Sequence, residues 1–194
     1  MIPVKFLDDL MRLKAVPRSG WISYRINKSD AESVASHSYS VAAIALLMSE
    51  TIRQRNVKIN EERILKMALL HDLSESLTFD ISKAYLRYLG RKGSRLKARL
   101  ELSAVSDILA GLRNEALALE FRTTLEEYFA AKSFEARVVH CADAADLLLQ
   151  IIEYERMGYS KTTLDPIWNE TMSKLVGWGV PLAKEWSKRL ERIR

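Results

Sequence analysis

The chain has 194 residues, of which 48% are hydrophobic and 28% are charged, with only seven glycines and four prolines. This composition excludes a collagen-like, mucin-like or intrinsically disordered protein, and the length suits one domain with a core of its own. The 30 basic and 25 acidic residues give a formal net charge of +5, which is compatible with an anionic small molecule or with nucleic acid and selects neither.

The cysteine count and the N-terminal segment indicate the cellular setting. The single cysteine, Cys141, excludes an intramolecular disulfide and a multi-thiolate zinc site. The first residues lack the uninterrupted apolar stretch of a signal peptide, and no run approaches the ~20 apolar residues that a membrane span needs. We therefore expect a reduced, cytoplasmic protein with no membrane partner.

Apolar residues recur at helical spacing from the N-terminus onward. A first helix is predicted over 4–15, ending before Pro17. Val4, Leu7, Leu10 and Met11 are the apolar residues of its stripe, which Lys14 extends. A polar loop over 17–30 follows, and then a helix over roughly 33–55. Asn60 is expected to cap the next helix, which runs through Leu73.

The second half of the chain shows the same spacing. After a basic turn, Ser94 is expected to cap a helix that carries Leu96, Leu100, Val105, Ile108 and Leu109, and two more helices are predicted over 113–131 and 134–157. The last two helices are expected to begin at Asp165-Pro166 and at Pro181. No strand pattern, repeat or linker interrupts them. The sequence therefore predicts a single all-α domain over 1–194, with a C-terminal helical extension over about 165–194.

Histidine is the most informative residue type, because the chain contains only three. His71 and Asp72 are adjacent at the end of an apolar helix, where a buried carboxylate needs a cation or hydrogen-bond donors. The negative end of the helix dipole makes an unpaired Asp72 still less favourable. A divalent metal bound by His71 and Asp72 resolves this conflict. The alternative is a salt-bridged or surface His-Asp pair, which is the commoner role of such a dipeptide.

Two further positions favour a metal site. His37 lies at the start of the 33–55 helix, and Asp143 lies within the apolar 134–157 helix. A carboxylate in such a stretch needs a partner, and this requirement applies to Asp143 or to the nearby Asp146. The alternative is a polar helix edge on which Asp143 faces solvent.

The order of these residues resembles the H…HD…D metal signature of the HD-domain metal-dependent phosphohydrolases, and the flanking residues are similar to their 5′-deoxynucleotidase branch. The closer resemblance is carried by Arg18-Ser19-Gly20-Trp21, Ser33-Val34-Ala35-Ser36-His37-Ser38, Glu75 with Asp80-Ile81, and Asp143 with Gln150-Ile151-Ile152-Glu153-Tyr154. Together these motifs cover roughly residues 5–157. Two features depart from the pattern. Ser36 replaces the usual acid before the metal histidine. Two residues separate Arg18 from Trp21, whereas the corresponding residues are adjacent in the bacterial branch.

The resemblance implies an HD-domain helical bundle with one metal site in its core, bound by His37, His71, Asp72 and Asp143. This mixed nitrogen and oxygen set suits a divalent Co²⁺, Mn²⁺, Fe²⁺ or Ni²⁺ ion better than structural zinc. Arg18 is the expected phosphate ligand, because its guanidinium matches two phosphate oxygens. From the residues alone, Arg18 could equally be a charge at a helix C-terminus.

The resemblance also implies three roles around the metal. Glu75 acts in catalysis as a proton donor or water-orienting group, and Asp80 positions or activates the attacking water, with acid and base unassigned between them. Trp21 helps to favour deoxyribose by crowding the 2′ position. The residues alone favour a simpler interpretation, in which Glu75 and Asp80 are capping residues and Trp21 packs on the helices.

We therefore expect a 5′-deoxynucleotidase that converts deoxyribonucleoside 5′-monophosphates to deoxynucleosides and phosphate, and the resemblance implies a homodimer. The first alternative is the same metal site acting on a triphosphate, a cyclic nucleotide or an alarmone, although Glu75-Ser76 differs from the Glu-Asp typical of alarmone hydrolases. The second is a non-catalytic helical module that binds nucleic acid or protein through the basic segment 87–99. No DNA-binding motif supports it, so nucleic acid is not an expected partner, and the segment is expected to form a solvated helical hairpin.

Overall fold

The computed structural model describes residues 2–194, apart from the side chains of Lys83, Ala84, Arg87, Arg91 and Ser94. The described residues form helices and connecting turns, with one isolated antiparallel bridge between Pro17 and Ser33. This confirms the all-α fold class. None of the described helices combines the length and the apolar character that crossing a bilayer demands.

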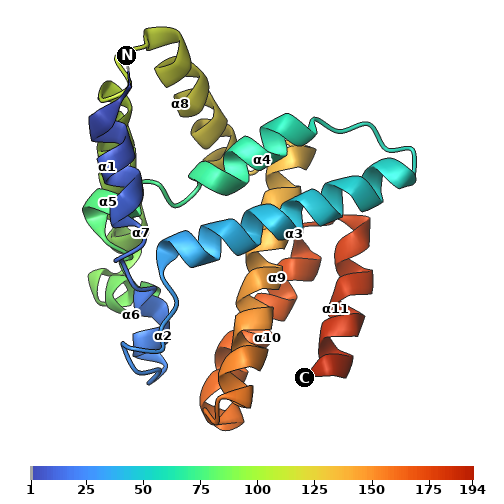
Figure 1. The fold of residues 1–194 in the computed structure, drawn as a ribbon. Helices are drawn as coiled ribbons and strands as arrows, with labels where there is room; N and C mark the ends of the chain where they lie inside the picture. The colour runs from blue at the N-terminus through green and yellow to red at the C-terminus, as the bar shows by residue number, and fades with distance from the viewer. Residues whose placement is uncertain (1) are drawn as a thin grey trace. The chain divides into compact units, whose positions relative to one another are not determined.

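Figure 1 shows the helices in chain order. They are α1 (Val4–Arg12), α2 (Ser19–Ser23), α3 (Val34–Gln54), α4 (Glu61–Leu70), α5 (Glu75–Thr78), α6 (Lys83–Leu86), the 3-10 helix η1 (Arg87–Leu89), α7 (Arg91–Ala110), α8 (Glu115–Ala130), α9 (Phe134–Arg156), α10 (Lys161–Gly177) and α11 (Pro181–Ile193). Their contacts divide the chain into two compact units. The first contains Met1–Ser38 and Leu70–Leu125, and the second contains Tyr39–Leu69 and Glu126–Arg194.

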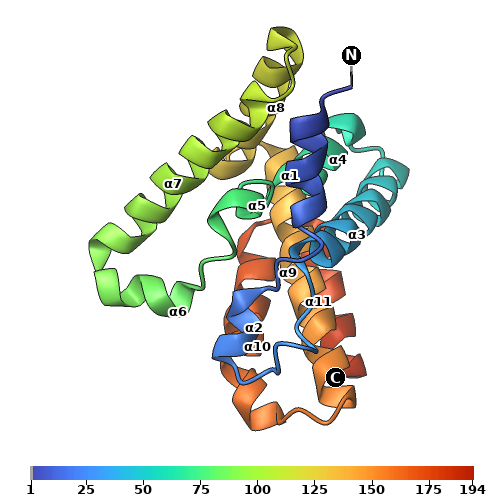
Figure 2. The same ribbon diagram turned by 60° about the vertical axis from the view of Figure 1, so that its left-hand side comes forward.

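In the first unit, α5 packs against both α1 and α7 (Figure 2). The buried apolar cluster beneath them includes Leu13, Leu73, Ile108 and Leu125. These side chains come from segments far apart in the sequence, and their burial is the main source of stability for such a unit.

The stripe predicted for α1 is wrong, because all four of its apolar residues are exposed. Phe6 and Asp9 face the interior instead, with the Phe6 ring 6.2 Å from that of Phe121. The Asp9 carboxylate is compensated by the Lys5 ammonium at 3.0 Å. Apolar residues occupy more than one face of α1, and the bulky Phe6 ring belongs to the face that is buried.

Several predicted boundaries are wrong, although the long helices α3, α8, α9 and α11 are confirmed. The expected 17–30 loop contains α2, which is too short to show a helical period. Helix α4 ends at Leu70 rather than Leu73. Helix α10 begins after Ser160, so Pro166 lies inside it rather than at its start. A proline inside a helix removes one backbone hydrogen bond, and the packing of α10 along α9 accommodates that loss.

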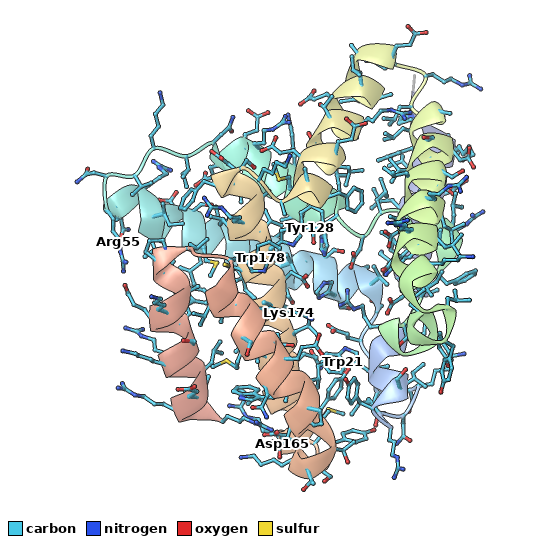
Figure 3. All side chains as sticks on the ribbon, turned by 180° about the vertical axis from the view of Figure 1, so that it is seen from behind. Trp21, Arg55, Tyr128, Asp165, Lys174 and Trp178 are labelled. Atoms are coloured by element: carbon cyan, nitrogen blue, oxygen red, sulfur yellow. The ribbon has the colours of Figure 1, made fainter. Side chains whose placement is uncertain are left out.

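In the second unit, α10 and α11 both pack against α9. The third histidine, His140, is stacked here between two aromatic rings, with centroids 4.2 Å from Tyr128 and 4.3 Å from Trp178. Figure 3 labels both of these flanking residues. The His140 Nε2 also lies 3.0 Å from the Tyr128 carbonyl oxygen. His140 therefore has a packing role in the second unit.

Candidate metal centre

A short antiparallel pairing brings Arg18 to the start of α3. The Arg18 amide donates to the Glu32 carbonyl at 2.9 Å, and the Val34 amide donates to the Val16 carbonyl at 2.8 Å. His37 follows in the first turn of α3. The chain before α2 and the beginning of α3 are therefore held together by backbone hydrogen bonds.

His71 and Asp72 lie in tight turns between α4 and α5. The Leu73 amide donates to the Leu70 carbonyl at 2.9 Å, and the Glu75 amide donates to the Asp72 carbonyl at 3.0 Å. Neighbouring side chains in a regular helix diverge by about 100°. Because the helix ends at Leu70, before both residues, the two side chains can approach one point.

Three of the four predicted metal ligands converge in the first unit. The Nε2 atoms of His37 and His71 are 3.3 Å apart, and the Oδ2 of Asp72 lies 3.6 Å from the former and 3.3 Å from the latter. The two histidine residues are 0% and 3% exposed. Two nitrogen lone pairs and a carboxylate oxygen at this spacing form a donor set that suits a divalent first-row transition metal. The residues therefore fit a metal ion.

Arg18 contacts the same carboxylate, with its Nη1 donating to Asp72 Oδ2 at 2.7 Å. Burial raises the pKa of Asp72, but His71, Arg18 and His37 outweigh it and hold this pKa below its ordinary value. The lowered pKa favours the ionised form of Asp72, which is the form that binds a metal.

Glu75 has the opposite electrostatic environment. Its residue is 4% exposed, and its Oε2 has no hydrogen-bond partner among the described residues. Burial, followed by the charges of Asp72 and Asp80, raises the pKa of Glu75 well above its ordinary value. A carboxyl group that retains its proton is suited to a general acid.

The remaining predicted site residues are Trp21 and Asp143. Trp21, labelled in Figure 3, is 2% exposed, and its indole nitrogen donates to Glu32 Oε1 at 2.8 Å. Asp143 is half-buried on α9 in the second unit, and Asp146 is buried three residues further on. Sugar contact by Trp21 and metal ligation by Asp143 both stay predictions.

Helix α7 carries a charged pair, Lys97 and Glu101, that was not among the predicted site residues. The Nζ of Lys97 lies 3.3 Å from the Oε1 of Glu101, and both side chains are mostly buried, at 21% and 18% exposed. Lys97 belongs to the basic segment 87–99 that was expected to be a solvated hairpin. The side chains of Arg87 and Arg91 in that segment lie outside the described residues. The four-residue spacing of Lys97 and Glu101 is visible in the sequence, but their inward orientation is not.

Comparisons with curated proteins reveal relatives that cover most of the chain. A Schizosaccharomyces pombe protein named 5′-deoxynucleotidase hdd1 is 35% identical over 79% of this chain and 72% of its own. The human protein named 5′-deoxynucleotidase HDDC2 is 32% identical over 88% of this chain and 77% of its own. A Dictyostelium discoideum protein of the same name is 30% identical over 98% of this chain and 97% of its own.

A solved structure and a family model agree with these relatives. The crystal structure of a Pyrococcus horikoshii protein has a TM-score of 0.79 and 28% identity, and the match covers 98% of this chain and 97% of that one. The family model described as HD domain matches residues 10–175. This range includes the converging histidines and aspartate, and the chain therefore belongs to the HD domain family.

Proposed function

We propose that this protein is a metal-dependent 5′-deoxynucleotidase, which hydrolyses the phosphomonoester bond of deoxyribonucleoside 5′-monophosphates. The observation that carries the proposal is the convergence of His37, His71 and Asp72 in a chain whose relatives are named 5′-deoxynucleotidases. We propose Asp143 as the fourth ligand and Co²⁺, Mn²⁺, Fe²⁺ or Ni²⁺ as the ion. When bound, such an ion polarises a phosphoryl oxygen and lowers the pKa of a bound water.

The surrounding residues supply the remaining functions. Arg18 contacts the Asp72 carboxylate through one of its guanidinium nitrogens. Its remaining donors and its positive charge suit the phosphate of the substrate. Glu75, whose raised pKa favours the protonated form, gives its proton to the leaving 5′ oxygen of the sugar. Asp80 orients the attacking water. Trp21 limits the space beside the sugar at the 2′ position.

The proposal extends to the substrate class, the oligomeric state and the cellular compartment. The substrate is a nucleotide, the active species is a homodimer, and the single HD domain spans 1–194. A buried free thiol at Cys141 suits the reduced cytoplasm that the sequence predicts. Light scattering on the purified protein measures the predicted dimer directly.

A substrate panel tests the activity. The purified protein, supplied with Co²⁺ or Mn²⁺, is expected to release phosphate from deoxyribonucleoside monophosphates faster than from ribonucleoside monophosphates or from triphosphates. Asp72→Ala should abolish the release, whereas the control Asp107→Asn, on the exposed surface of α7, should leave it unchanged. Absence of phosphate release from every monophosphate with either metal would disprove the proposed activity.

A further inference from the structure

The first half of helix α7 turns a charged pair inward and two leucines outward. Leu96 and Leu100 are 48% and 45% exposed, whereas the adjacent Lys97 and Glu101 side chains are mostly buried. Apolar side chains ordinarily occupy the buried positions, and removing two charges from water costs several kcal/mol per ion before their attraction is counted. The buried Val105 and Ile108 lie on the same face of α7 and set which side turns inward, but their packing does not account for charged residues at positions 97 and 101.

Stabilisation of α7 itself does not account for the pair either. Lys97 precedes Glu101 by four residues, and this order is less favourable in a helix than the reverse. The 3.3 Å separation is also longer than the 2.7–2.9 Å of a strong charged hydrogen bond. An ammonium group has three donors, so Lys97 retains donors for another acceptor.

The pair belongs to a helix that packs against the short helix beginning at Glu75. Helices α5 and α7 pack together (Figure 2), and Glu75 is the first residue of α5. Burial lowers the pKa of Lys97, but Glu101, Glu75 and Asp80 together raise it above its ordinary value. Glu75 is in turn influenced by both Arg18 and Lys97. Lys97 is therefore a charged cation on the α7 side of the site that contains Arg18.

Acidic side chains around the site favour an additional cation beside Arg18 and the proposed metal ion. Asp72, Glu75, Asp80 and Glu101 bring four carboxyl groups to this region. A phosphate dianion that enters a partly desolvated site of this kind is repelled unless cations face it. Arg18 already shares its guanidinium with Asp72.

We propose that Lys97 is a second phosphate-binding residue, which contacts the substrate phosphate together with Arg18, while Glu101 holds its ammonium in place before the substrate arrives. This inference rests on the proposed function for the identity of the substrate. It assigns a role to a residue of the basic segment 87–99.

Binding of inorganic phosphate to the metal-loaded protein tests the inference without requiring turnover. Isothermal titration calorimetry should show that Lys97→Met weakens phosphate binding by about 10- to 100-fold, the range for losing one hydrogen bond to a charged group. The control Arg99→Met removes an exposed charge from the same helix and should bind phosphate like the wild type. Lys97→Arg, which keeps the charge, should restore most of the affinity. Phosphate affinity of Lys97→Met equal to the wild type overturns the inference.

A second measurement uses the unaltered protein and does not depend on a variant folding. Acetic anhydride modifies accessible amines, and mass spectrometry reports each lysine separately. Inorganic phosphate should slow acetylation of Lys97 but not that of Lys92, which is exposed on the same helix. Equal effects on both lysines overturn the inference. If the wild type binds phosphate through Lys97 yet hydrolyses no monophosphate, the proposed function fails and the phosphate site stands.

Discussion

The guanidinium of Arg18 donates to Oδ2 of Asp72 at 2.7 Å, and this oxygen is also the one that faces His37 and His71. The Arg18 guanidinium therefore competes with a metal ion for this one oxygen atom of Asp72. Competition of this kind is reciprocal, so each cation weakens the binding of the other to Asp72. Metal binding would then leave Arg18 available to a phosphate.

Replacement of Arg18 should consequently separate metal binding from catalysis. Arg18→Gln is expected to keep or increase the affinity for Co²⁺, because the competing charge is gone. The kcat/KM for a deoxyribonucleoside monophosphate should fall by about 100-fold, since two charged hydrogen bonds to phosphate are lost. Metal titration and steady-state kinetics measure the two effects. Arg95→Gln, an exposed change on α7, serves as the control, and loss of metal from Arg18→Gln would contradict the prediction.

The two acids of α9 should differ in their effect on the metal. Asp143→Asn is expected to lower metal affinity by about 100-fold or more, because even the outer partners of metal ligands contribute roughly 10- to 100-fold. Asp146→Asn should retain the metal. Elemental analysis of both purified variants gives the answer, and the opposite ranking would move the fourth ligand from Asp143 to Asp146.

Glu75 should make the stability of the metal-free protein depend on pH. Its folded pKa is raised above the ordinary value of about 4.3, so its contribution is fully present below that pH and is lost as pH rises through the folded pKa. Glu75→Gln should therefore be more stable than the wild type at pH 8, by about 1.4 kcal/mol for each unit of the shift, and this advantage should shrink toward pH 5. Urea unfolding in the presence of EDTA measures it. Glu126→Gln, at an exposed position, should show no such trend, and a pH-independent effect of Glu75→Gln would contradict the prediction.

The indole hydrogen bond of Trp21 should contribute to stability. Trp21→Phe keeps an aromatic ring but loses the bond to Glu32, so the free energy of unfolding is expected to fall by about 1.5–3 kcal/mol, the range for a hydrogen bond to a charged group. Trp186→Phe, at a half-buried position in α11, should cost less. Denaturant unfolding compares the two variants, and equal losses would show that the bond to Glu32 contributes nothing specific.

Local sequence signals predicted the long helices and several of their ends. The Asn60 side chain accepts a hydrogen bond from the Arg63 amide at 3.0 Å, as expected of a cap, and Pro181 occupies the first turn of α11. Such signals depend on residues three or four positions apart, so they can be recognised in the sequence without knowledge of the fold. The failures concern α2, which is too short to show a period, and Pro166, whose usual place at a helix start was overridden by the packing of α10 on α9.

The periodic apolar residues were enough to predict the all-α class. The order of rare residue types was enough to predict the family resemblance and to single out His37, His71 and Asp72. The tertiary structure decided which face of α1 is buried, that Arg18 contacts Asp72, and that Lys97 turns inward on α7. Each of these outcomes depends on side chains that lie tens of residues away in the chain. Their contact energies are set by burial and charge in three dimensions, which no local pattern records.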